Sequence, residues 1–70
     1  MFYRIEREGA GRYTCAAVLR KDDDCAVRTL KILKTSFGWY ANSSMHSGLD
    51  NAKHAVVAAL RKRWPSIKEA

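Results

Sequence analysis

The segment from Ser47 to Pro65 constrains the fold most, because it has the pattern of one amphipathic helix with signals at both ends. Ser47 is expected to cap the helix, with Asp50 as the reciprocal acid three residues later. Pro65 is expected to end it, since proline disfavours helical geometry at the residue before it. One broad side is apolar on a 3.6-residue period, and it comprises Leu49, Ala52, Val56, Val57, Ala59, Leu60 and Trp64. That side can close a small core, while the other side is left to present charge.

The chain before this helix has the patterns of β-strands. Residues 2–8 alternate and are rich in Phe, Tyr and Ile, and Gly9-Ala10-Gly11 follows as a turn, since glycine adopts positive φ at little steric cost. Residues 12–20 are mostly apolar on both faces, which predicts a central strand. The remaining expected elements are a short strand over 37–41, a loop over 42–48 and a frayed end over 66–70.

Residues 25–34 fit two patterns. As a strand they carry three β-branched residues, which suit a pleated surface. As a helix they would begin after Asp24 and align three basic side chains on one face. The short polar connection over residues 20–24 and the apolar strand before it suit a hairpin, so a strand is the preferred prediction.

These elements predict one small α+β domain over residues 1–70. It is expected to have two layers, with an antiparallel sheet of three or four strands packed on the C-terminal helix. A chain of 70 residues buries only about 60% of its unfolded surface, so its core is small. A deep substrate cleft roofed by a second domain is excluded at this length.

The charge is unevenly distributed along the chain. Through Asp24, five acids match five bases, whereas from Cys25 onward there are eight bases and two acids, which accounts for the net charge of +6. A one-sided positive field favours acidic partners such as nucleic acid or an acidic protein surface. Solubility alone is the alternative explanation.

Two cysteines, Cys15 and Cys25, are present, and their spacing matches no zinc pattern. The sequence from Met1 has no apolar leader region, so we expect a cytoplasmic, reducing compartment in which both thiols are free. No apolar stretch is long enough to span a bilayer.

No catalytic set is evident. The two histidines, His46 and His54, are best explained as a loop residue and a helix-surface residue. The acids Asp22, Asp23 and Asp24 suit a turn better than a metal site, because three consecutive acids cannot all face one ion. We therefore expect no enzymatic activity, no metal and no cofactor.

The candidate contact residues are basic or aromatic. Lys53 lies within the apolar arc of the helix, where its stem can cover the core while its ammonium reaches water, or where it can meet a phosphate near the first helical turn. Trp39 is preferred over Tyr40 as an exposed contact, since adjacent strand residues face opposite ways. The basic candidates form one group at the helix end, Arg61, Lys62 and Arg63, and a second, Arg28, Lys31 and Lys34, that is coherent only if residues 25–34 are helical. The first group also complements the helix dipole, which is a purely structural role.

The run Ala52-Lys53-His54-Ala55-Val56-Val57, with Leu60 after it, resembles the second half of a double-stranded-RNA-binding domain, in which a helix with an Ala-Lys motif follows three antiparallel strands. The resemblance covers less than half of the chain. That family has a lysine pair just before this motif, whereas Leu49 and Asp50 stand there in this chain. The resemblance therefore implies only Lys53 as a candidate phosphate contact.

These observations lead to a non-enzymatic binding protein, and to two main hypotheses about its partner. The first is nucleic acid, bound mainly through its phosphates by the basic helix face. The alternative is an acidic protein surface, as for a phage- or mobile-element-type accessory protein that binds and inhibits a host protein. A contiguous apolar patch centred on Trp39 or Tyr40 would favour the alternative. Homodimerisation through a sheet edge fits so small a core, and membrane-surface binding ranks lowest because the apolar helix face is needed for the core.

Overall fold

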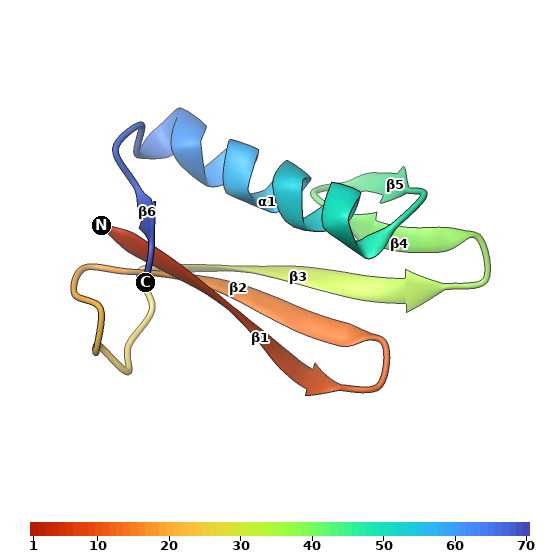
Figure 1. Cartoon of the computed structure of the whole chain (residues 1–70), viewed down its shortest axis with the longest axis horizontal. Coiled ribbons are helices and arrows are strands. Elements are labelled where there is room, and N and C mark those ends of the chain that lie inside the picture. Colours follow the sequence, from red (N-terminus) through yellow and green to blue (C-terminus); the bar gives the residue numbers. More distant parts are fainter.

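One helix lies on one face of a six-stranded sheet in the computed structural model, which describes all residues 1–70 (Figure 1). The elements are β1 (Phe2–Gly9), β2 (Arg12–Val18), β3 (Arg28–Thr35), β4 (Gly38–Ala41), β5 (Ser44–His46), α1 (Leu49–Arg63) and β6 (Lys68–Glu69). The α+β class and the single C-terminal helix are confirmed. The expected count of three or four strands is wrong, because two short strands escaped prediction.

The strands follow the order β5-β4-β3-β2-β1-β6. The first five form an antiparallel meander, while β6 returns from the end of the chain and pairs in parallel with β1. β2 is therefore an interior strand, as its two apolar faces predicted. Residues 28–35 form β3 and pair with β2, which resolves the ambiguity over this segment in favour of a strand.

The turn between β4 and β5 explains why a loop was expected over residues 42–48. Asn42 and Ser43 both have positive φ, 52° and 62°, which is the backbone of a tight two-residue hairpin turn. Ala41 and Ser44 then pair directly across the turn. The prediction of a continuous loop over residues 42–48 is wrong, because Ser44–His46 form the strand β5 by pairing with β4.

α1 begins one residue later than the predicted cap requires. Its N-cap is Gly48, which makes no side-chain capping bond, and the Ser47 hydroxyl instead accepts a bond from the Asn51 side chain at 3.1 Å. The predicted capping box of Ser47 and Asp50 is therefore not formed. The helix does end before Pro65 as predicted, with the Trp64 amide bonded to the Leu60 carbonyl at 2.8 Å.

The core lies between α1 and the sheet. α1 lies over β2, β3, β4 and β5 and leaves β1 at its side. The core residues come from the helix-facing positions of the strands, from the predicted side of α1 and from the C-terminal segment, and they comprise Cys15, Ala17, Ile32, Ala41, Ala52, Val56, Val57, Leu60 and Ile67. Burial raises the pKa of the Cys15 thiol from 9.0 to about 11, because the thiolate would lose its hydration. Cys25 is exposed, and the two cysteines are not bonded to each other.

The C-terminal segment is anchored, so the expectation of a frayed end over residues 66–70 is wrong. Ile67 is 3% exposed and belongs to the core. The amides of Lys68 and Ala70 donate to the carbonyls of Met1 and Tyr3 at 3.2 and 2.9 Å. One buried side chain thus holds β6 against β1, which also brings the two ends of the chain together (Figure 1).

Candidate binding surfaces

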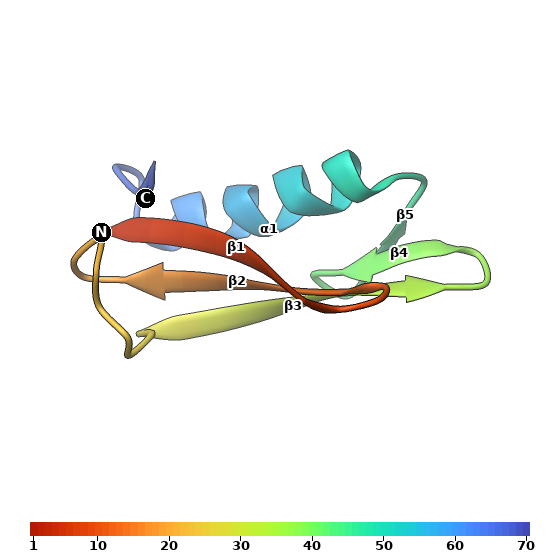
Figure 2. The same cartoon turned by 60° about the horizontal axis from the view of Figure 1, so that its bottom comes forward.

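The sheet has one face covered by α1 and one face over which no helix lies (Figure 2). Since side chains alternate along a strand, every strand contributes to both faces. On β3, Ile32 is fully buried against α1, whereas its neighbour Leu33 is 38% exposed on the opposite side. We call this opposite side the open face.

An apolar row crosses the open face. Leu33 pairs with Tyr40, and Tyr40 pairs with Met45, so the three side chains lie side by side across β3, β4 and β5. They are 38%, 43% and 47% exposed. Phe37, in the turn between β3 and β4, is 87% exposed. These three cross-strand neighbours, Leu33, Tyr40 and Met45, are called the apolar row below.

The other end of the open face is covered by the chain itself. The connection between β2 and β3 folds back there, held by Arg4, which donates to the carbonyls of Lys21 and Asp23 at 3.1 and 2.8 Å. Val18 lies on the open-face side of β2, yet it is fully buried. The protein thus shields one apolar end of this face and leaves the apolar row uncovered.

Cations flank the apolar row. Arg12 is the cross-strand partner of Leu33, and Lys31 precedes Leu33 by two residues on the same face. Both side chains are exposed and line a shallow hollow of about 360 Å³ together with Glu8 and Thr14. An apolar strip beside two cations is the arrangement that this face offers to a partner.

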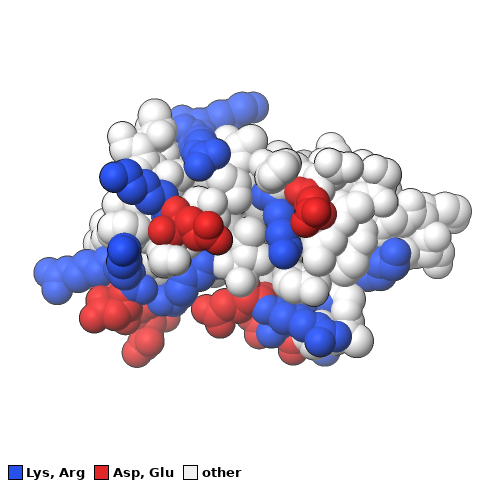
Figure 3. Space-filling view, in the orientation of Figure 1, with Lys and Arg blue, Asp and Glu red and all other residues white.

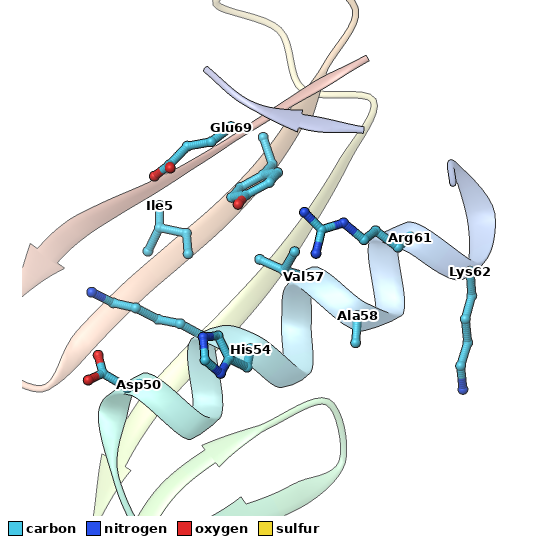
Figure 4. A pocket seen from close by; sticks show the side chains of 10 residues that line it. Ile5, Asp50, His54, Val57, Ala58, Arg61, Lys62 and Glu69 are labelled. Carbon is cyan, nitrogen blue, oxygen red and sulfur yellow. The ribbon is translucent and has the colours of Figure 1, made fainter. Parts of the chain in front are cut away.

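A second surface is the groove between α1 and β1, with a volume of about 600 Å³. Its floor is apolar, and Ile5 and Val57 face one another across it (Figure 4). The Arg61 side chain extends from α1 toward the strands that carry Ile5 and Glu69, whereas the Lys62 side chain points away from them (Figure 4). Ala58 adds to the apolar floor, and the rest of the lining is charged, polar or aromatic: Tyr3, Asp50, Lys53 and His54.

The predicted aromatic contact is on the covered face. Trp39 packs against the core and meets Tyr13 edge-on, with ring centroids 5.8 Å apart. The Lys34 and Lys53 ammonium groups lie 5.4 and 5.5 Å from the Trp39 and Tyr13 ring centroids. Of the two adjacent aromatic residues, Tyr40 is therefore the one on the open face. The Lys53 side chain lines the groove between α1 and β1 and carries its ammonium over the Tyr13 ring.

The two predicted basic groups are arranged differently from one another. On a strand, Arg28 and Lys34 share the helix side while Lys31 lies on the open face, so the second group is not one patch. The side chains of the first group point in different directions, because successive helix residues are about 100° apart. This group comprises Arg61, Lys62 and Arg63. Together they make the end of α1 basic without making one basic face.

Charge is mixed over the face drawn in Figure 3, where acidic and basic side chains alternate. The Arg63 guanidinium lies 5.8 Å from the Trp64 ring centroid, which holds it against the helix end. The sole ion pair within 4.0 Å joins Arg4 to Glu6, at 3.3 Å. The eight bases of the second part of the chain thus have no acidic partner at this distance.

Sequence reasoning missed the apolar row and Ile5. The row could have been found by pairing the strands in register, because Leu33, Tyr40 and Met45 share a face only once Leu33 is placed opposite Tyr40. From the sequence, Ile5 was only one residue of the strand predicted over residues 2–8. It became a groove residue because α1 stops short of β1.

No group of three or more His, Cys, Asp or Glu side chains is placed where it could hold a metal ion. α1 is too short and too polar to cross a membrane. The chain matches no family model, and neither the curated proteins nor the solved structures include a similar protein. The fold and its two surfaces define a small α+β protein with one helix on a six-stranded sheet.

Proposed function

We propose that this is a small binding protein that docks its open face on an acidic surface of a partner protein. The observation that carries the proposal is the apolar row, with Tyr40 at its centre. Protein interfaces place aromatic anchors at the middle of a desolvated patch and polar groups around it. Leu33 and Met45 flank Tyr40, and Arg12 and Lys31 supply the polar border.

The charges beside the row favour a different protein over a second copy of the chain. Two copies stacked face to face with β2 over β2 would bring the Arg12 and Lys31 side chains close to their own equivalents. Like charges across an interface cost several kcal/mol. A partner with carboxylates around an apolar pocket would instead match both the row and its border. The covered surface of the partner would then be inaccessible to other molecules, and in this way the protein would act as an inhibitor.

A photo-crosslinking experiment tests this proposal. The photoreactive residue p-benzoylphenylalanine replaces Tyr40 in one variant and Lys62, on the far side of α1, in a control. We expect a partner protein to crosslink at position 40 and not at position 62. Leu33→Asp should abolish the product while the circular dichroism spectrum stays native. Equal crosslinking at both positions, or products formed only between copies of this chain, would contradict the proposal.

The acidic character of the partner has its own test. The double charge reversal Arg12→Glu/Lys31→Glu should reduce the yield at position 40 at least about tenfold, since each close charge pair at an interface couples by about 1.5 kcal/mol or more. The matched reversal Lys62→Glu/Arg63→Glu changes the net charge equally and should leave the yield unchanged. Equal losses in both variants would indicate a general effect of charge.

Nucleic acid is a second candidate partner, because the bases at the end of α1 have no acidic side chain within 4.0 Å. Phosphates would be contacted there by Arg61, Lys62 and Arg63. Fluorescence-anisotropy titration with labelled duplex RNA, duplex DNA and single strands tests this. The slope of log K against log salt should be about −0.9 for each phosphate neutralised on duplex DNA. Reversing the three bases to Glu should abolish binding, and a salt-independent or unchanged affinity would refute this candidate.

A further inference from the structure

The outer edge of β5 carries no charged side chain. β5 ends the strand order on its side, and no Asp, Glu, Lys or Arg occurs from Thr35 to Leu49, although 29% of the chain is charged. The strand at the opposite end of the order, β6, consists of Lys68 and Glu69. Proteins commonly protect sheet edges with charges, proline or a bulge, because free backbone groups pair readily with another strand. The only such protection of β5 is its length of three residues, which keeps any contact small.

The free backbone groups on this edge belong to Met45. Ala41 and Ser44 flank a two-residue turn, so they exchange both of their backbone bonds. Hydrogen-bonded and non-hydrogen-bonded pairs alternate along an antiparallel ladder, so the next pair, Tyr40 and Met45, is not hydrogen-bonded. The Met45 N–H and C=O groups therefore point away from β4. No strand or helix lies beyond them, because α1 leads from the end of β5 toward the other end of the sheet (Figures 1 and 2).

A second copy of the chain fits this edge. Antiparallel pairing about a two-fold axis at Met45 would place the two Met45 residues opposite each other, and each would donate its N–H to the C=O of the other. Ser44 would lie opposite His46 on both sides of the axis, so the pairing brings no like charges together. The His46 ring is engaged within its own chain, because Nε2 donates to the Ala41 carbonyl at 3.1 Å. The edge is therefore self-complementary, as a closed dimer requires.

The same pairing extends the apolar row. Met45 is the outermost member of this row, and it is 47% exposed. Since residues opposite each other in a ladder point to the same face, the row of one copy would meet the row of the other at the two Met45 side chains. Each Met45 would then cover part of the other, and the row would continue through Tyr40 and Leu33 of both copies. A copy of this chain is favoured over another strand, because it supplies a matching row in the required position.

We propose that two copies of the chain pair edge to edge through β5 and form a two-fold dimer in which the two six-stranded sheets become one. The contact is small, so the dimer is weak and dissociates at about 10 µM protein. Both open faces lie on the same side of the joined sheet, and the dimer presents two docking surfaces to a partner at once. Edge pairing leaves these faces uncovered, so it is independent of what they bind.

Sedimentation equilibrium measures the dimer directly. We expect the mass to rise from 7.9 kDa at about 10 µM protein toward twice that value at about 1 mM. A chemically synthesised chain with an N-methyl group on the Met45 amide should remain at 7.9 kDa, since methylation removes the donor without changing a side chain. The matched control carries the methyl group on the amide of Asp22, which is exposed in the connection between β2 and β3, and should dimerise normally. A mass of 7.9 kDa at about 1 mM wild-type protein, or equal dimerisation of the two methylated chains, would overturn the proposal.

Cysteine crosslinking tests the position of the two-fold axis and does not require the methylated chains to fold. In a Cys25→Ser background, Met45→Cys would place two thiols on facing residues whose Cα atoms are about 5.5 Å apart, within the range of a disulfide. Phe37→Cys is the control, because this residue is 87% exposed and lies outside β5. At about 100 µM protein we expect disulfide-linked dimers to form about tenfold faster for Met45→Cys, since pairing raises the local thiol concentration to about 1 mM. Equal rates, or faster linkage for Phe37→Cys, would refute pairing at Met45.

Leu33→Asp distinguishes the edge dimer from two copies stacked through their open faces. Leu33 lies two strands away from the proposed axis, so the new charges of the two copies would be separated by more than a Debye length. We expect the dimerisation constant measured by sedimentation to stay within about threefold of the wild-type value. Loss of the dimer in this variant would assign the association to the open face and reject the edge.

Discussion

Leu60 offers the sharpest test of the core, because it is 1% exposed and lies in α1 against the sheet. Leu60→Ala removes three buried carbons, worth about 2.4 kcal/mol at about 0.8 kcal/mol each. The cavity left behind adds to this, and Leu→Ala changes in cores cost about 2–5 kcal/mol in total. A 70-residue domain has a free energy of unfolding of about 3.5–10 kcal/mol, at 0.05–0.15 kcal/mol per residue. We therefore expect this one change to remove about a fifth or more of the free energy of unfolding.

Urea unfolding followed by tryptophan fluorescence measures the loss, because both Trp39 and Trp64 pack against the core. Leu19→Ala is the matched control: Leu19 is 65% exposed, so the same chemical change should cost less than about 1 kcal/mol. Leu60→Val removes less volume and provides a measurable variant if the alanine variant does not fold. Equal losses for Leu60→Ala and Leu19→Ala, or a loss under about 1 kcal/mol for Leu60→Ala, would refute the assignment of the core.

Three further predictions follow from local structure. Gly38→Ala should lower the melting temperature, because Gly38 has φ 139° and an added Cβ would lie 2.5 Å from the His46 carbonyl oxygen; a thermal melt at or above that of the wild type would contradict this. The Cys15 thiol has a folded pKa of about 11 against 9.0, so its contribution to stability is intact below pH 9 and is lost as the pH rises toward 11, by about 1.4 kcal/mol near pH 10. Cys15→Ala should lack this component of the alkaline loss. With a thiol reagent at neutral pH, Cys25 should react quickly and Cys15 only on unfolding, and two equally fast thiols would exclude a buried Cys15.

The parts of the fold that local patterns determine were predictable from the sequence. The apolar period of α1, the alternation in β1 and the two apolar faces of β2 each extend over at least seven residues and identify their elements. β5 and β6 are three and two residues long, and all but one of those residues are polar or charged. Such short segments become strands only because a neighbouring strand presents free backbone groups, which no local pattern records.

The candidate surfaces were less predictable than the elements, because they depend on which side of each strand the helix covers. Trp39 and Tyr40 are adjacent, so their roles were bound to be opposite, but the assignment required the register of β4 on β3. The groove could be predicted only with the knowledge that α1 lies toward β4 and β5 and away from β1. The sequence analysis named an apolar patch around one of these two aromatic residues as the feature that would favour a protein partner. Such a patch lies around Tyr40, with Leu33 and Met45 beside it.

The anchoring of β6 also has a consequence for the order of folding. Three of the four connections in the meander are two residues long, so most strand pairs close small loops, whereas the pair formed by Tyr3 and Glu69 closes a loop of nearly the whole chain. Loop-closure entropy grows with loop length, so this contact costs the most entropy of any in the sheet. We expect it to form after the folding transition state, and Ile67→Ala should then speed unfolding while leaving the folding rate nearly unchanged. The seam between the two ends of the chain would be the last part of the molecule to close and the first to open.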